Sequence, residues 1–160
     1  ELYTQKITAD IFARKVLDLE HGEYIRYGVL DASTWARRGD IGPSIAETMI
    51  QAGCRWRPSD RTGRSRISGK LEIHKRLKVE DKEPGIRIFS NCRNLLRTFP
   101  TLPLDDSNPE DINTHVEDHA YDALRYGCMS RPMHTSYANK AFGNSNRTAN
   151  FVPSDKIFGY

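Results

Sequence analysis

The stretch Tyr24-Ile-Arg-Tyr-Gly-Val-Leu-Asp31 is rich in aromatic and β-branched residues and runs directly into a carboxylate. Such residues favour β-strands, so we expect a buried strand that ends at Asp31. On its N-terminal side, residues 7–19 repeat apolar side chains at helical spacing, and Gly22 follows as a helix stop. On its C-terminal side, residues 42–53 begin with Gly-Pro and predict a second helix. Strands that alternate with helices in this way are typical of an α/β layered fold.

Beyond residue 53 the chain has fewer strand signals than a complete α/β sheet requires. Residues 54–57 indicate a short strand, and Ile86-Arg-Ile-Phe89 indicates the second clear strand of the chain. Three further helices are predicted: from Ser68 through Leu77, around Leu95 and Leu96 up to Pro100, and from Asn113 or Thr114 to Gly127 or Cys128. Residues 131–160 are rich in Asn, Ser, Thr and Gly without a period, so we expect an extended or flexible tail there.

A formal net charge of +3, from 24 Lys and Arg against 21 Asp and Glu, hides a segregation of charge along the chain. Basic residues gather between Arg55 and Lys78, where only Asp60 and Glu72 oppose them. Residues 105–122 hold seven acids and no Lys or Arg. A basic block suits a polyanion such as nucleic acid, and an acidic block suits a divalent metal ion. Two solvated faces of an ordinary protein are the alternative interpretation.

The composition argues against a membrane protein and against a disulfide-stabilised one. No apolar stretch of about 18 residues is present, so we expect no membrane-spanning helix. The first residues lack the basic and apolar regions of a secretory signal. The three cysteines, Cys54, Cys92 and Cys128, are odd in number and form no Cys-x-x-Cys pair. We therefore expect neither a disulfide framework nor a cysteine zinc site, and we infer a reducing compartment.

The predicted helix His115-Val-Glu-Asp-His-Ala-Tyr-Asp-Ala-Leu-Arg-Tyr126 carries the clearest chemical pattern. At about 100° per residue, one sector of this helix presents His115, Asp118, His119 and Asp122. Two carboxylates and two imidazoles on one face suit a divalent ion, and carboxylate oxygens suit Mg²⁺ or Mn²⁺. The alternative is a solvated polar face, with Glu117 and Asp118 next to the positive N-terminus of the helix.

Asp31 supplies a carboxylate from a different part of the chain. Because it ends a strand, we expect it at the carboxyl-terminal edge of the sheet, where open α/β sheets place ligands. Asp31 together with Asp118 and Asp122 on a helix has the layout of a two-metal site for phosphoryl transfer. The alternative role for Asp31 is that of a turn residue whose side chain caps its own backbone.

The basic block suits contacts with a phosphate backbone. The segment Gly63–Leu71 is close to a phosphate-binding loop, but five residues separate its glycines and Leu71 replaces the metal-binding hydroxyl. We therefore expect no nucleotide site there. Trp35 and Trp56 could stack on bases or pack in the core. The candidate DNA-binding residues are Arg55, Arg57, Arg61, Arg64, Arg66, Lys70, Lys75 and Arg76.

Several segments resemble the large terminase subunits of tailed bacteriophages. Glu117-Asp-His-Ala-Tyr-Asp-Ala-Leu-Arg-Tyr-Gly127 resembles their last catalytic motif. Tyr27-Gly-Val-Leu-Asp31-Ala-Ser, followed by Gly42-Pro-Ser-Ile-Ala-Glu47, resembles their middle-acid motif. The connecting region resembles theirs in Ile88-Phe-Ser-Asn-Cys-Arg-Asn-Leu-Leu96 and Leu102-Pro-Leu-Asp-Asp106. The resemblance covers about residues 7–130.

The resemblance implies a partial ribonuclease H-like nuclease domain over residues 1–130, with a mixed sheet flanked by helices. Such domains cut concatemeric double-stranded viral DNA during genome packaging, using two Mg²⁺ or Mn²⁺ ions. The resemblance makes Asp31 the second catalytic carboxylate and Asp122 the third, with His119 as a neighbouring ligand or orienting group and Asp118 as an auxiliary ligand. The implied partners are double-stranded DNA, the terminase small subunit, the portal protein and an upstream ATPase domain. The implied location is the host cell cytoplasm.

In that family, the first strand of the fold carries the first catalytic Asp. We expect this chain to begin after that strand, near the first helix, and therefore to lack that acid. We also expect the 160-residue chain alone to be a weak or inactive nuclease. Two alternatives stay open: a non-catalytic module that clamps DNA or docks on a portal-like partner, and a resolvase-type nuclease of the same fold that acts on branched DNA.

Overall fold

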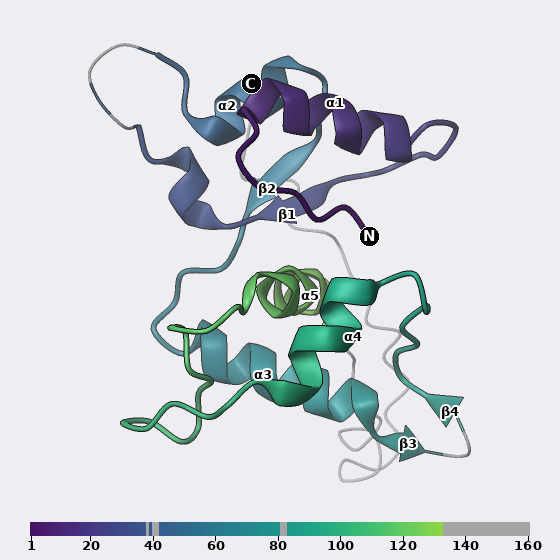
Figure 1. Ribbon diagram of the computed structural model, residues 1–160, viewed down its shortest axis with the longest axis vertical. Coiled ribbons are helices and arrows are strands. Elements are labelled where there is room, and N and C mark those ends of the chain that lie inside the picture. Colours follow the sequence, from purple (N-terminus) through teal and green to yellow (C-terminus); the bar gives the residue numbers. More distant parts are fainter. Residues whose placement is uncertain (38, 40–41, 81–82, 133–160) are drawn as a thin grey trace, which may run out of the picture.

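Helices and short strands in two layers form the computed structural model, which describes residues 1–37, 39, 42–80 and 83–132 (Figure 1). The elements are α1 (Ala9–Leu19), β1 (Gly28–Leu30), η1 (Ala32–Trp35), α2 (Ile45–Gln51), β2 (Trp56–Pro58), α3 (Ser65–Leu77), β3 (Val79–Glu80), β4 (Glu83–Pro84), α4 (Arg93–Thr98), η2 (Phe99–Thr101) and α5 (His119–Ser130). One layer holds α1, α2, β1 and β2, and the other holds α3, α4, α5, β3 and β4. The predicted α/β class is confirmed. Within the described part, every helix is too short or too polar to span a bilayer.

The strands β1 and β2 form a parallel pair in which Gly28 lies opposite Trp56 and Val29 opposite Arg57. Parallel strands need a crossover connection, and the segment that contains η1 and α2 supplies it. Gly28 lies so close to its partner that a Cβ there would stand 2.1 Å from the Trp56 indole ring. Glycine is therefore required at this point of the pair.

Each layer has its own hydrophobic cluster. In the first layer, Ala13 of α1, Met49 of α2 and Cys54 are buried together, and Leu30 and Trp56 pack against them. Trp56 therefore serves the core, which was one of its two predicted roles. This cluster fixes β1 and β2 beneath the two helices and so positions the residue that follows β1.

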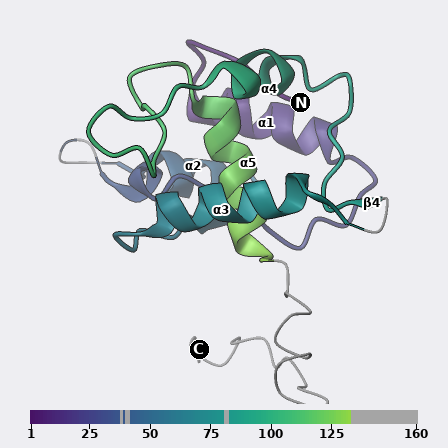
Figure 2. The ribbon, with the colours of Figure 1, turned by 90° about the horizontal axis from the view of Figure 1, so that it is seen from below.

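The second layer is built around the crossing of α3 and α5, which Figure 2 shows from below. Ile73 of α3 and Tyr121 and Cys128 of α5 form its buried cluster together with Ile112. The Tyr121 ring lies 5.6 Å from the Phe99 ring of η2, so aromatic packing ties the end of α4 to α5. This cluster fixes α5 beneath the parallel strands.

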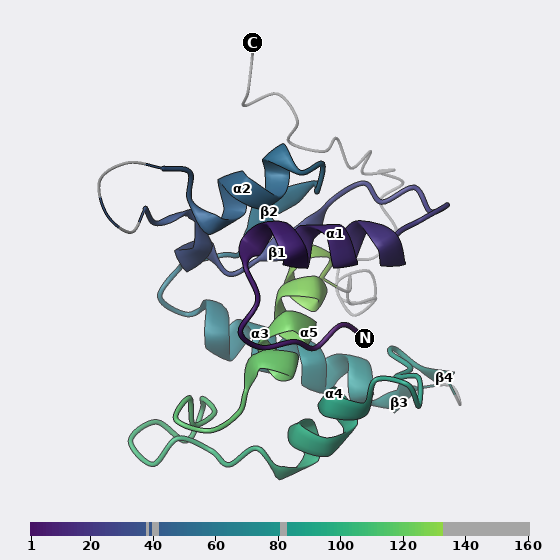
Figure 3. The ribbon, with the colours of Figure 1, turned by 45° about the horizontal axis from the view of Figure 1, so that its top comes forward.

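Side chains cap two of the helices. Ser44 accepts a hydrogen bond from the backbone N–H of Glu47, whose carboxylate accepts one from the N–H of Ser44. This reciprocal capping box starts α2 at Ile45, slightly later than the predicted start at residue 42. At α4 the cap comes from far away in sequence, because the Glu1 carboxylate accepts from the N–H groups of Asn94 and Leu95. Figure 3 shows the N-terminal segment running from α1 past α5 toward α4.

The strands are shorter than predicted. Only Gly28–Leu30 of the predicted strand at 24–30 pairs, because β2 offers three residues and Tyr24 is exposed. The predicted strand Ile86–Phe89 is wrong: these residues are irregular, and no strand in the described ranges pairs with them. Ile86 instead packs against the second cluster, while Phe89 is exposed.

The starts of two helices also differ from the predictions. The α3 helix begins at Ser65 rather than at Ser68. The α5 helix begins at His119 rather than at residue 113 or 114, because side chains hold the preceding loop in turns. Asn113, for example, accepts a hydrogen bond from the N–H of His115, which is an alternative to helical pairing. Most of the predicted tail, residues 133–160, lies outside the described residues.

Candidate functional site

The carboxyl-terminal edge of the β1–β2 pair faces α5. Asp31 follows β1 directly, and Ser59 and Asp60 follow β2. The Ser59 hydroxyl accepts a hydrogen bond from the N–H of Ala32 at 3.0 Å, and the Ser59 N–H donates to the carbonyl of Leu30 at 2.8 Å. These bonds hold the two strand ends together, so the residues after both strands lie at one edge, as expected for parallel strands.

Asp31 and Asp122 meet at the hydroxyl of Tyr126. Tyr126 lies one turn beyond Asp122 on α5, and its hydroxyl donates to Asp31 Oδ2 at 2.5 Å. The same hydroxyl lies 3.3 Å from Asp122 Oδ2. A phenol carries one proton, so the shorter bond to Asp31 is the dominant one. The predicted convergence of these two carboxylates is therefore present in the fold.

Hydrogen bonds keep Asp31 in its charged form. Burial raises the pKa of Asp31, but bonds from Ser33 and Tyr126 outweigh burial and leave this pKa below its ordinary value. The bond from the Ser33 N–H is the turn-capping interaction that was the alternative role of Asp31, and this part of the prediction is observed. Burial and the bond to Asp31 raise the pKa of Tyr126. At neutral pH the pair is therefore a carboxylate and a protonated phenol.

Arg125 balances the charge of Asp122. Its Nε and Nη2 both lie 2.9 Å from Asp122 Oδ1, and only 4% of Arg125 is exposed. The guanidinium also lies 4.5 Å from the centre of the Tyr126 ring. Two charge-assisted N–H groups on one carboxylate oxygen form a strong contact that restricts the orientation of Asp122. Asp122 thus keeps Oδ2 on the side of the Tyr126 hydroxyl while Oδ1 is paired.

Both carboxylates line an open cavity of about 410 Å³. Its wall includes the segment from Ser59 to Arg66, so Arg61 and Arg66 enter the same space as Asp31 and Asp122. With Asp60 and Arg125, the lining holds three acids and three guanidinium groups, so a cation and a phosphate can both be neutralised in this cavity.

The other predicted metal ligands lie elsewhere. His119 is the first residue of α5, its side chain is largely exposed, and it lines a separate cavity beside the N-terminal segment. Asp118 precedes the helix and is nearly buried, and burial together with the charge of Asp122 raises its pKa. His115 lies in the preceding loop. The prediction that His115, Asp118, His119 and Asp122 share one helix face is therefore wrong, because α5 starts at His119.

In the described residues, no group of three His, Cys, Asp or Glu side chains is arranged to hold a metal ion. Asp31 and Asp122 are a pair: the Asp31 oxygens accept from Ser33 and Tyr126, and the Asp122 oxygens lie against Arg125 and, at 3.3 Å, the same Tyr126 hydroxyl. Two carboxylates aimed at a common point do fit one divalent ion completed by water, which is how Mg²⁺ is usually held. The donor set is thus chemically suitable for Mg²⁺ or Mn²⁺.

Much of the predicted DNA-binding block binds the protein itself. Arg66 pairs with Asp111 at 2.8 Å, and Lys70 donates to the carbonyls of Pro109 and Glu110. Burial lowers the pKa of Arg66, but the bond to Asp111 and nearby acids outweigh burial and raise it. The basic and acidic blocks therefore neutralise each other where the loop before α5 crosses α3.

The remaining residues of the predicted DNA-binding block lie in three places. On α3, Arg76 and Lys75 pair with Glu72, and Arg76 also donates to the carbonyl of Cys128. At the other end, Arg55 lies over the Tyr24 ring and Arg57 over the Tyr27 ring, at 5.5 and 4.2 Å from the ring centres. Arg61 lines the cavity of Asp31 and Asp122, and Arg64 is the residue just before α3.

Sequence reasoning did not single out Tyr126, Arg125 or Asp60. The signal for the first two was their spacing, since positions three and four after Asp122 on a helix face the same way. The signal for Asp60 was the strand ahead of it, because Asp60 follows β2 much as Asp31 follows β1.

Comparison of the chain with protein-family models, with curated protein sequences and with solved structures finds no match in any of the three.

Proposed function

We propose that this chain is the core of a metal-dependent endonuclease with a ribonuclease H-like fold, related to the nuclease domain of terminase large subunits. In this proposal it cuts concatemeric double-stranded viral DNA during packaging in the host cytoplasm. Its partners are then the terminase small subunit, the portal protein and an ATPase domain. One observation carries the proposal: Asp31 and Asp122, from distant parts of the chain, converge on one hydroxyl at the edge of a parallel sheet.

The chemistry follows from what lines the cavity. Asp31 and Asp122 would hold Mg²⁺ or Mn²⁺, and such ions neutralise phosphate charge and activate water for attack on a phosphodiester. Arg61 shares the cavity with the acids and can bind the phosphate itself, whereas Arg66 is held by Asp111. Tyr126 holds the Asp31 carboxylate in place through its hydrogen bond. Arg125 fixes Asp122 Oδ1 and leaves Oδ2 directed into the site.

The proposal is tested by titrating Mn²⁺ into the ¹⁵N-labelled chain and following paramagnetic broadening of backbone amide signals. We expect saturable broadening centred on the residues around Asp31 and Asp122. Asp31→Asn and Asp122→Asn should each abolish saturation, because an amide is a much weaker ligand than a carboxylate. The matched control is Asp106→Asn, which removes an exposed acid of the loop before α5 and should leave the titration unchanged.

Broadening that does not saturate, or that survives both Asn variants, would exclude a metal site at these two acids. Such a result, combined with retained binding of duplex DNA, would favour the non-catalytic DNA-clamping module. Saturable binding together with cleavage of branched but not linear duplex DNA in Mn²⁺ would favour the resolvase-type nuclease.

A further inference from the structure

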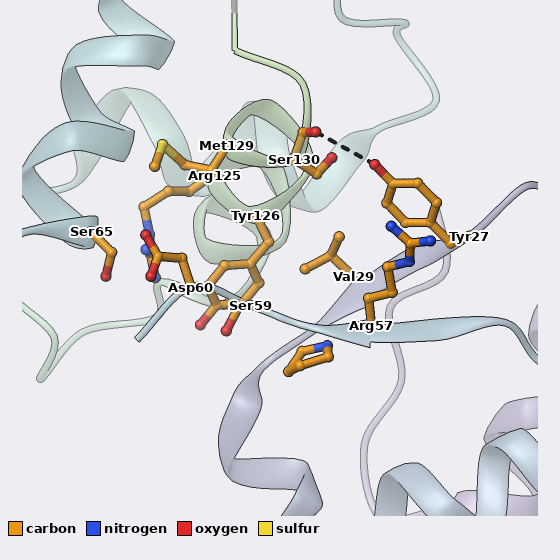
Figure 4. Close-up of a pocket in the computed structure, with 11 residues that line it drawn as sticks. Tyr27, Val29, Arg57, Ser59, Asp60, Ser65, Arg125, Tyr126, Met129 and Ser130 are labelled. Carbon is orange, nitrogen blue, oxygen red and sulfur yellow. Dashed lines mark hydrogen bonds between the residues drawn. The ribbon is translucent and has the colours of Figure 1, made fainter. Parts of the chain in front are cut away.

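A second cavity, of about 290 Å³, adjoins the cavity that Asp31 and Asp122 line. It lies between the β1–β2 pair and the last turns of α5 (Figure 4). Tyr27 and Arg57 stand at one end and Ser59, Asp60 and Tyr126 at the other, with Val29 between them. The two cavities meet, because five lining residues belong to both: Ser59, Asp60, Ser65, Arg125 and Tyr126. A ligand in the second cavity therefore lies next to whatever binds at Asp31 and Asp122.

The strand register explains why this cavity exists. Val29 and Arg57 are opposite each other in the parallel pair, so their side chains leave the same face of it. On that face Val29 is small, and Met129 and Ser130 of α5 form the opposing wall. The larger side chain of Trp56 leaves the other face, where it packs against the first cluster.

The chemistry of the walls matches a nucleoside. Arg57 is stacked on the Tyr27 ring at 4.2 Å, and bases stack readily on aromatic rings and guanidinium planes. Val29, Pro58 and Met129 supply apolar surface, and the hydroxyls of Ser59 and Ser65 can contact the polar edge of a base. The volume lies at the lower limit of small-ligand pockets, so one nucleoside fits and a base-paired duplex does not.

We propose that this cavity receives a single unpaired nucleoside, whose phosphate lies beside the metal ion that Asp31 and Asp122 would hold. This inference rests on the proposed nuclease function and specifies the state of its DNA substrate at the cut: one nucleotide is unstacked and unpaired from the duplex. A nucleotide in that position places its sugar and base along Tyr126 and Ser59, where the two cavities meet. Tyr27 is then a specificity-determining residue, because its ring completes the stacking platform.

The test compares the binding of two fluorescently labelled probes, a short oligothymidylate and a blunt DNA duplex. Binding is measured by fluorescence polarisation in a buffer that contains Ca²⁺. Tyr27→Leu should raise the Kd for the oligothymidylate about 5- to 150-fold, as expected when one base loses an aromatic stacking partner. The Kd for the duplex should change less than about twofold, because a paired base cannot enter the cavity. Tyr27→Phe should restore binding of the oligothymidylate, since the ring remains.

Tyr24→Leu is the matched control. Tyr24 also stands under an arginine, Arg55, but it lines neither of the two cavities. It should leave both probes unaffected. Tyr27→Phe also separates stacking from structure, because it removes the hydroxyl that lies 3.5 Å from the carbonyl of Ser130 while keeping the ring.

The inference is overturned if the wild-type chain binds Mn²⁺ and the duplex but not the oligothymidylate, or if Tyr27→Leu and Tyr24→Leu act alike. Either result leaves the proposed nuclease standing. Conversely, oligothymidylate binding through Tyr27 without saturable Mn²⁺ binding would refute the nuclease and keep the nucleoside site. If Tyr27→Leu fails to fold, thymidine monophosphate is titrated into the wild-type chain. Shifts at Tyr27, Val29 and Met129 then support the site, and shifts confined to other residues overturn it.

Discussion

Gly69, in the middle of α3, is the position where one added carbon should disturb the site most. A Cβ there would lie 2.4 Å from Cγ and 2.7 Å from Cδ of Arg125. Arg125 is 4% exposed, and its guanidinium is held by Asp122 at 2.9 Å. The side chain is fixed at both ends, so it cannot move aside without loosening the ion pair.

Two opposing effects set the magnitude for Gly69→Ala. Replacing glycine in a helix interior by alanine ordinarily stabilises a protein by about 0.5–1 kcal/mol. Overpacking a buried contact costs about 1–3 kcal/mol, and the overlap with Arg125 places this case toward the upper end. We therefore expect the variant to lose about 1–2 kcal/mol of unfolding free energy, because the steric cost exceeds the helix gain.

Urea denaturation followed by circular dichroism measures this loss. The control is Gly127→Ala in α5, where no heavy atom lies within 4 Å of the added Cβ. That variant should gain about 0.5–1 kcal/mol, so the two alanine substitutions should shift the midpoint in opposite directions. A Gly69→Ala protein as stable as the wild type would show that α3 and α5 are not packed as closely as described.

Three further predictions concern the two layers. Hydrogen bonds from Arg97 and then Tyr3 lower the pKa of Glu117 to about 2. The stabilisation from this carboxylate is therefore complete above its unfolded pKa and is lost as pH falls from about 5 to 2, so the urea midpoints of wild type and Glu117→Gln should converge over that range. Met49→Ala should lower the unfolding free energy by about 2–5 kcal/mol, measured by thermal denaturation, since Met49 is 1% exposed. An unchanged melting temperature would contradict the burial of Met49 in the first cluster. Ser44→Ala should cost about 1 kcal/mol by urea denaturation through loss of the α2 cap, whereas Ser44→Asp should retain most of the stability.

The parts of the fold that local chemistry determines could be predicted from sequence. Apolar spacing over residues 7–19 predicted α1, and Gly22, with a φ of +82°, ends that segment as a helix stop should. The strand that runs into Asp31 was placed correctly at its carboxyl end. These features depend on neighbours in the chain, which a pattern of residues reports directly.

Features that depend on distant partners were missed. Residues 86–89 have strand-forming side chains, but a strand also needs a pairing partner. Ile86 instead packs against the hydrophobic cluster of the second layer. The α5 helix begins later than predicted, because side chains of the preceding acidic loop form turns there instead. The pairing of Arg66 with Asp111 turned two separate charge blocks into one neutralised contact, which no local charge count reveals.

The same reasoning applies to the site. The convergence of Asp31 and Asp122 could be predicted, because a strand end and a helical spacing are local properties. His119 was grouped with Asp122 by helical spacing, and both do lie on α5, but the largely exposed His119 side chain lines a different cavity beside the N-terminal segment. Tyr126 became visible as the link between the two acids only when β1 and α5 were brought together.

The hydrogen bond from Tyr126 to Asp31 joins the two layers, since Asp31 directly follows β1 of the first layer and Tyr126 lies on α5 of the second. A ligand that binds both Asp31 and Asp122 must therefore also stabilise the contact between the two layers. By thermodynamic linkage, a ligand at 100 times its Kd adds about 2.7 kcal/mol to that stability. The reverse also holds: a substitution that weakens the contact between the two layers, even far from either acid, should weaken binding of the ligand. The affinity for a ligand at this site therefore reports how stably the two layers are packed together.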